Sequence, residues 1–159
     1  MAQDIGPRPR AVQQLMRRSR RDWGASRAIV GVLRADSKAA QALERALAEV
    51  DLTLPQFNVL MVLAASPTAS LPLFELNAQL VSTPPNTTWL TNRMEERGLV
   101  TKRRDQGDRR VVLLELTESG WRTLGVAAPV VFAAEKGLLS GFNAEEITTL
   151  GNLLTRLVR

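Results

Sequence analysis

Apolar positions recur at helical spacing near both ends of the chain. From Ile29 to Asp51 they fall at intervals of three, four or seven residues, with charged residues on the other faces. This pattern predicts one long amphipathic helix. A second such pattern predicts a C-terminal helix up to Leu157, which begins at Asn143 because an Asn followed three residues later by Glu146 is typical of a helix start.

Three shorter helices are predicted directly after the first. Thr53, followed by Pro55 and Gln56, predicts a helix start at which the threonine hydroxyl accepts from the amide of Gln56. Leucines at helical spacing after Pro72 predict the next short helix. The third follows Pro84-Pro85 and ends at Gly98, because prolines are tolerated where the first amides of a helix lack internal partners.

The pattern changes to strand, turn and strand after Gly98. Residues 100–104 and 111–116 are predicted as strands, and residues 105–108 as the turn, in which Gly107 supplies backbone freedom. Thr117 is predicted to cap a further helix. Pro129 should kink that helix or end it near Ala128, with helix resuming beyond.

This order of elements predicts a mainly α fold with a small two-stranded β wing. Two short helices followed directly by a basic hairpin form a winged helix-turn-helix, which terminal helices extend. The predicted parts are a basic N-terminal arm or short helix at 1–27, an N-terminal dimerisation helix at 28–52, a winged DNA-binding lobe at 53–117 and C-terminal dimerisation helices at 118–159.

Composition excludes several classes of protein. Hydrophobic residues make up 45% of the 159 residues and charged residues 23%, and no apolar run is long enough to span a membrane. The chain has neither cysteine nor histidine, so disulfides, thiolate nucleophiles, imidazole bases and the usual zinc ligands are excluded. We therefore expect no enzyme, cofactor or metal site. Because the basic N-terminus lacks the features of a secretory signal, we expect a cytoplasmic, nucleoid-associated protein.

The net charge of +5 is unevenly distributed. Residues 1–27 hold seven arginines and two aspartates, while the remaining residues balance. Within that balanced part, the stretch from Arg93 to Arg110 carries a local charge of +3. Two basic clusters favour a polyanionic partner, and a merely solvated surface is the alternative. We expect residues 1–10 to form a loose arm and residues 11–22 a short basic helix, both adding phosphate contacts.

The helix before the hairpin is the candidate for the major groove, which just admits a helix. An asparagine amide can pair with adenine, and a threonine methyl can meet a thymine methyl. Trp89 either joins this surface or packs in the core. The candidate contact residues of this helix are Pro85, Asn86, Thr87, Thr88, Trp89, Asn92 and Arg93.

The hairpin tip carries two adjacent arginines, Arg109 and Arg110, after Asp108. A guanidinium extended from such a tip suits the narrow minor groove, and Asp108 could hold one arginine through a charge-assisted bond. Arg103 on the first strand completes the candidate DNA contacts. An ordinary salt-bridged surface turn is the alternative interpretation.

Four segments together resemble the MarR family of bacterial transcription regulators: LTLPQFNVL at 52–60, NRMEERGLV at 92–100, DRR at 108–110 and LTESG at 116–120. The similarity spans roughly residues 28 to 158. It implies a sequence-specific regulator of transcription, a repressor, that binds a palindromic operator as a homodimer. The alternatives are a winged-helix protein-interaction module or a DNA-binding protein without sequence specificity.

The resemblance also assigns roles to single residues. Arg110, rather than Arg109, takes the position of the minor-groove arginine, and Thr88 that of the recognition-helix threonine. Trp89 departs from the family pattern, because arginine is frequent there, and Asn77 replaces a small alanine. The dimer role falls to Leu150, Leu154 and Leu157. Many members bind small anionic aromatic effectors, and the candidate lining residues are Trp23, Phe57, Trp121 and Phe132, with core packing as the alternative.

Overall fold

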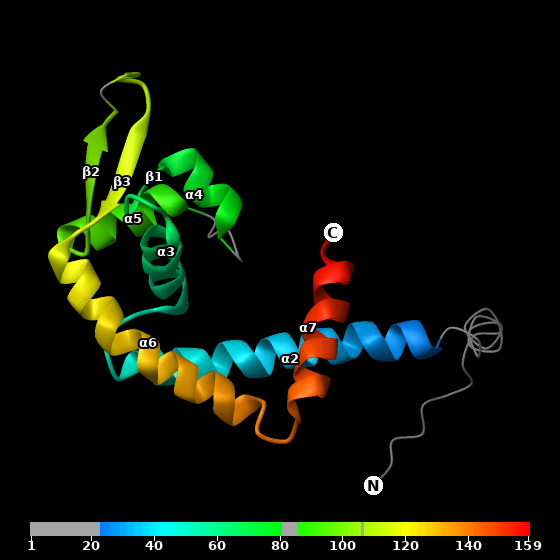
Figure 1. The fold of residues 1–159 in the computed structure, drawn as a ribbon. Helices are drawn as coiled ribbons and strands as arrows, with labels where there is room; N and C mark the ends of the chain where they lie inside the picture. The colour runs from blue at the N-terminus through cyan, green and yellow to red at the C-terminus, as the bar shows by residue number, and fades with distance from the viewer. Residues whose placement is uncertain (1–22, 81–85, 106) are drawn as a thin grey trace, which may run out of the picture. The chain divides into compact units, whose positions relative to one another are not determined.

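The computed structural model describes residues 23–80, 86–105 and 107–159 (Figure 1). It divides into two compact units, Met1–Lys38 and Ala39–Arg159. The elements in chain order are α2 (Trp23–Ala48), α3 (Leu54–Ala65), β1 (Ser70–Pro72), α4 (Leu73–Gln79), α5 (Thr87–Glu96), β2 (Val100–Arg104), β3 (Val112–Leu116), α6 (Glu118–Leu138) and α7 (Ala144–Leu157). The arm and basic helix predicted within residues 1–22 lie outside the described residues.

The two helix starts predicted at Thr53 and Asn143 are confirmed, each with a reciprocal capping box. Thr53 Oγ1 accepts from the amide of Gln56 at 3.4 Å, and Gln56 Oε1 accepts from the amide of Thr53 at 3.0 Å. The same reciprocal pair forms between Asn143 and Glu146 at 2.9 and 2.8 Å. Each pair satisfies two amides that a helix leaves without partners, so local sequence alone determines where α3 and α7 begin.

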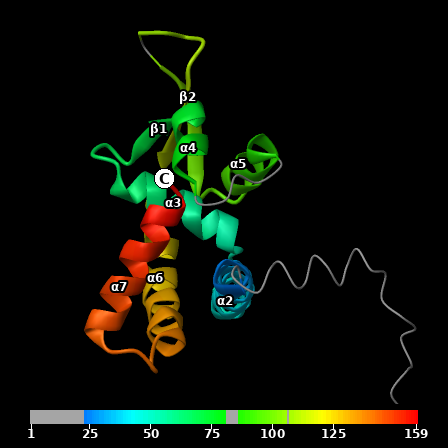
Figure 2. The same ribbon diagram turned by 90° about the vertical axis from the view of Figure 1, so that its right-hand side faces the viewer.

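The sheet has three antiparallel strands in the order β1-β3-β2, whereas the sequence predicted only the wing hairpin. In the hairpin, Val100 lies opposite Leu116 and Arg104 opposite Val112. The strand that sequence reasoning missed is β1, whose three residues pair with β3 so that Leu71 lies opposite Leu114. A strand this short has no period of its own and exists only because β3 supplies its partner. Figure 2 shows the β2–β3 tip extending beyond the helices of the lobe.

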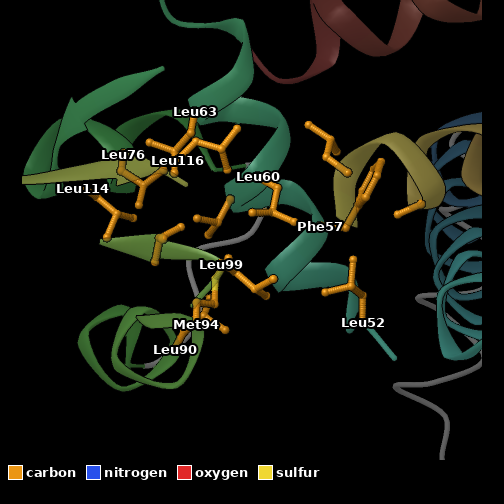
Figure 3. Packing of buried hydrophobic residues seen from close by; sticks show 14 of the residues in the cluster. Leu52, Phe57, Leu60, Leu63, Leu76, Leu90, Met94, Leu99, Leu114 and Leu116 are labelled. Atoms are coloured by element: carbon orange, nitrogen blue, oxygen red, sulfur yellow. The ribbon is translucent and has the colours of Figure 1, made fainter. Parts of the chain in front are cut away.

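The core of the second unit lies between α3, α4, α5, α6 and the sheet. Figure 3 shows Leu63 and Leu76 against Leu114 and Leu116 of β3, and Leu90 and Met94 projecting from α5 toward Leu99. Leu60, Leu63, Leu76, Met94 and Leu114 are fully inaccessible to solvent. This packing holds α5 and the wing hairpin in one rigid lobe.

The helix after the wing is longer than predicted. Thr117 caps it through a bond from the amide of Gly120, as expected, but it runs without a break to Leu138. The expected end near Ala128 is therefore wrong. Ala127 and Val131 are buried on either side of Pro129, so packing offsets the roughly 3 kcal/mol that an internal proline costs.

No helix in the described part of the chain is both long and apolar enough to cross a membrane.

Gly120 lies against the backbone of the turn that precedes β2. A Cβ at this position would overlap the carbonyl oxygen of Leu99 and lie 2.8 Å from Leu116 Cδ1. We predict that Gly120→Ala lowers the free energy of unfolding by about 1–3 kcal/mol, because a backbone carbonyl cannot move aside. Urea unfolding followed by circular dichroism measures the change.

Gly125 on the same helix is the matched control, since a Cβ there meets no atom within 4 Å. Gly125→Ala should leave stability unchanged or raise it by about 0.5–1 kcal/mol, the ordinary preference of a helix for alanine. Equal effects of the two substitutions would contradict the close approach at Leu99.

Candidate nucleic-acid interface

The N-cap of α5 and its buried residues together determine which face of the helix is exposed. Asn86 caps the helix, its Oδ1 accepting from the amide of Trp89 at 2.9 Å. The buried side consists of Thr87, Leu90, Thr91 and Met94. The exposed face therefore carries Thr88, Trp89, Asn92 and Arg93, four of the predicted contact residues. Pro85, also predicted as a contact, lies outside the described residues.

Three of the predicted contact residues on α5 are already engaged by the protein. Thr87 is only 8% exposed, so its side chain faces the core and not a partner. The Oδ1 of Asn86 is the helix cap, and the Oδ1 of Asn92 accepts from Lys102 Nζ on β2. A bidentate contact with adenine uses the same amide oxygen, which in both asparagines already accepts one bond within the protein.

Trp89 is exposed, which decides between the two interpretations of this residue. Its side chain is 61% accessible, so core packing is wrong. The guanidinium carbon of Arg93 lies 5.9 Å from the centre of the Trp89 ring, within cation–π range. Arg93 Nη1 also lies 3.8 Å from Glu96 Oε2. The two residues form one stacked pair on the exposed face of α5.

The C-terminal end of α5 is fixed by bonds that no local pattern predicted. Arg97 Nη2 donates to the carbonyl oxygen and to Oδ2 of Asp51, both at 2.8 Å. Glu95 Oε1 accepts from the amide of Lys102 at 2.8 Å, which joins the helix to β2. The partners of Arg97 lie more than 40 residues away in sequence, so spacing gave no signal. The Glu95 bond orients α5 relative to the wing, and the Arg97 bonds tie the end of α5 to the segment before α3.

The wing strands pair most of their own charges. Arg103 Nε lies 2.7 Å from Glu115 Oε2 on the neighbouring strand, so this predicted contact residue already has a carboxylate partner. Arg104 Nη1 donates to the carbonyl oxygen of Arg109 at 3.1 Å. The two arginines therefore brace the hairpin. Half-exposed pairs of this kind add little stability, so their main effect is on geometry.

Two aspartates shape the turn at the wing tip. Asp105 Oδ1 accepts from the amides of Asp108 and Gly107 at 2.9 and 2.8 Å, which lowers the pKa of the Asp105 carboxyl, and the Arg103 charge lowers it further. Asp108 Oδ1 accepts from the amide of Arg110 at 2.9 Å. We expected Asp108 to hold a guanidinium, but it holds the backbone instead, because the turn points that amide at it.

Arg109 and Arg110 are left as the free charges of the wing. Both are exposed, and within the part of the chain that the structure describes neither forms an ion pair. Their backbone is fixed at the Arg109 carbonyl and the Arg110 amide. Two unpaired guanidinium groups on a rigid turn suit binding to a phosphate-rich groove.

The predicted effector residues fall into two kinds. Phe57 is 5% exposed among the core leucines, so the core interpretation is confirmed for it. Trp121 and Phe132, at 47% and 52% exposure, are not core residues of a single chain. Trp23, at 54%, belongs to the other unit. The core interpretation is therefore wrong for these three, and their role as effector contacts stays a prediction.

Comparison with known proteins points the same way as this geometry. The MarR family model matches residues 52–112. The transcriptional regulator HosA of Escherichia coli is 31% identical over 108 residues, which cover 68% of this chain and 78% of that protein.

Two DNA-bound structures share the fold. A cysteine-to-serine mutant of E. coli MarR complexed with operator DNA is 25% identical, with a TM-score of 0.74, and the match covers 84% of this chain and 97% of that one. The transcriptional repressor CouR, bound to a 23-mer DNA duplex, is 29% identical with a TM-score of 0.74, over 81% and 90% of the two chains.

The wing turn should loosen in acid. Because the folded pKa of Asp105 is below its ordinary value of 3.8, its stabilisation of the turn is complete above that value and is lost as pH falls through the folded pKa. In NMR spectra the amides of Gly107 and Asp108 should therefore shift with a midpoint below 3.8. Asp105→Asn, which keeps an acceptor oxygen but does not titrate, should abolish that transition. A midpoint at or above the ordinary value would refute the arrangement.

Proposed function

Because the chain belongs to the MarR family of DNA-binding transcriptional regulators, we propose that it represses its target genes by binding a palindromic operator as a homodimer. Members of the family are regulators and not enzymes. In the proposed complex α5 enters the major groove and the wing reaches the adjacent minor groove. Two copies then present their recognition helices about 34 Å apart, one turn of DNA.

The observation that carries this proposal is the contrast, within the segment from Arg93 to Arg110, between the wing tip and the other basic residues. Arg93, Arg97, Lys102 and Arg103 have a carboxylate within 4.0 Å, and Arg104 donates to the carbonyl oxygen of Arg109. Arg109 and Arg110 have none among the described residues, although two aspartates hold the turn that carries them. Exposed guanidinium groups without an internal partner remain available to an anionic partner.

The dimer part of the proposal rests on the apolar face of α7. No residue of this helix is buried, yet Leu150, Leu154 and Leu157 lie on one side of it at spacings of four and three. Leu153 and Leu157 are more than half exposed. An apolar stripe along an entire helix needs a partner surface, and the long helices of a second copy supply one.

For the small aromatic effector, the candidate binding site is a groove beside α5. A groove of about 450 Å³ is lined by Leu52, Thr53, Gln56, Trp89, Leu90, Arg93 and Arg97, together with Ala48 and Asp51. The Trp89 ring and the Arg93 guanidinium suit a small aromatic anion, whereas Arg97 is bonded to Asp51. Such a ligand would compete with DNA for Trp89 and Arg93, and release from the operator would follow.

We predict that Arg110→Ala weakens binding to the operator by roughly 5- to 100-fold, as expected for about 1–3 kcal/mol from one inserted arginine. The measurement is fluorescence anisotropy with a duplex from upstream of the chain's own gene and with a scrambled duplex. Arg122→Ala is the control, since it removes one charge from an exposed α6 pair with Glu118. Equal binding of both duplexes by the wild type would overturn operator recognition, and a neutral Arg110→Ala would favour an interaction module.

Dimerisation should depend on the α7 stripe. Leu154→Glu places a carboxylate where the proposed interface is dry, so we expect monomers in sedimentation velocity at micromolar concentration. Asn152→Glu, on the polar side of the same helix, should leave the dimer intact. Circular dichroism distinguishes lost association from lost folding. A Leu154→Glu protein that remains dimeric would show that another surface joins the copies.

A further inference from the structure

Few side chains of the recognition helix are available to read bases. Thr87 is buried, and the amide oxygens of Asn86 and Asn92 are bonded within the protein. What the first two turns of α5 present to a partner is therefore Thr88 and the stacked pair of Trp89 and Arg93. These exposed side chains take no part in the helix cap or in bonds to β2, so they are the main candidates for any sequence preference of this helix.

Trp89 offers a large apolar surface at the position where base edges are met. An indole has one donor and no acceptor, so it cannot make the two-point contact that distinguishes one base pair from another. The apolar feature of the major groove is the C5 methyl group of thymine. A side chain that is 61% exposed and lies in the first turn of α5 is placed to cover such a methyl group.

Arg93 lies one helical turn after Trp89, and two neighbouring groups restrain its side chain. The ring lies 5.9 Å from its guanidinium carbon, and Glu96 Oε2 lies 3.8 Å from Nη1. Such restraint lowers the entropy that an arginine loses when it binds. A guanidinium held beside the ring can donate to O6 and N7 of a guanine next to the covered methyl group.

We propose that Trp89 and Arg93 act as one base-reading unit, in which Trp89 covers a thymine methyl group and Arg93 contacts the neighbouring guanine. This inference rests on the proposed function, because it needs α5 in the major groove. Charge supports DNA as the occupant, since the unpaired Arg109 and Arg110 of the wing belong to the same lobe as this face. In the free protein the ring and the guanidinium preorganise each other.

The test is a double-mutant cycle between protein and DNA. Each thymine of the operator half-site is replaced in turn by deoxyuridine, which lacks only the methyl group. With the wild type, one replacement should weaken binding about fourfold per half-site, the worth of one buried methyl group. With Trp89→Ala the same replacement should have no further effect. Trp89→Phe, which keeps an apolar ring, should retain part of the dependence.

Arg93 is tested with 7-deazaguanine, which removes the N7 acceptor. The guanine next to the sensitive thymine should lose affinity with the wild type and lose nothing further with Arg93→Ala. Trp89→Ala should also weaken this guanine effect, because the ring orients Arg93. Phe74→Ala, which removes another exposed aromatic ring of the lobe, is the control and should leave both dependences intact.

The outcomes distinguish a failure of the proposed function from a failure of the inference about Trp89 and Arg93. A wild-type protein that prefers no duplex overturns the proposed function and this inference together. A wild type that prefers its operator but shows no thymine coupled to Trp89 overturns the inference alone. Loss of dimerisation with Trp89→Ala would assign the ring to a protein contact and would also overturn it.

Discussion

The close approach of α6 to the turn between α5 and β2 is the contact on which the geometry of the lobe depends. Gly98, with a φ of +68°, ends the recognition helix in the left-handed region, which turns the chain into the wing. Thr117 Oγ1 then donates to the carbonyl oxygens of Gly98 and Leu99 at 2.6 and 3.0 Å. Because Gly120 lacks a side chain, α6 can begin directly on this backbone. One turn thus fixes the end of α5, the start of β2 and the start of α6.

Internal pairing, and not the number of basic residues, determines which charges are available to a partner. The segment from Arg93 to Arg110 carries a net charge of +3, but most of its cations are bonded within the lobe. Those pairs are largely exposed and contribute little stability. Their effect is to orient α5 and stiffen the hairpin, so that the free charge is concentrated at Arg109 and Arg110.

Features that depend on local chemistry were predictable from the sequence, and features that depend on distant partners were not. Thr53 and Asn143 mark helix starts because the cap and its partner lie three residues apart. β1 was missed because its existence depends on β3, more than 40 residues later. Helix α6 continues through Pro129 because of core packing, which the residues next to the proline in the sequence do not reveal.

The same distinction applies to the candidate interface. The wing arginines could be predicted from a turn motif, and their free state agrees with that motif. The asparagines were expected to read adenine, a prediction from residue type alone, but the fold uses their oxygens as a cap and as an acceptor for Lys102.

A recognition helix whose polar groups mostly serve the protein leaves a narrow basis for sequence discrimination. Thr88, Trp89 and Arg93 span little more than one turn of α5, so in the proposed complex each copy would meet only a few base pairs directly. Wing arginines respond to the width and potential of the minor groove, which depend on sequence without base-specific bonds. For a site of useful selectivity, two copies must combine these short contacts with groove shape. In the proposed complex the exposed apolar stripe of α7 and the free arginines of the wing are therefore linked requirements, because one copy alone would make too few contacts to select an operator.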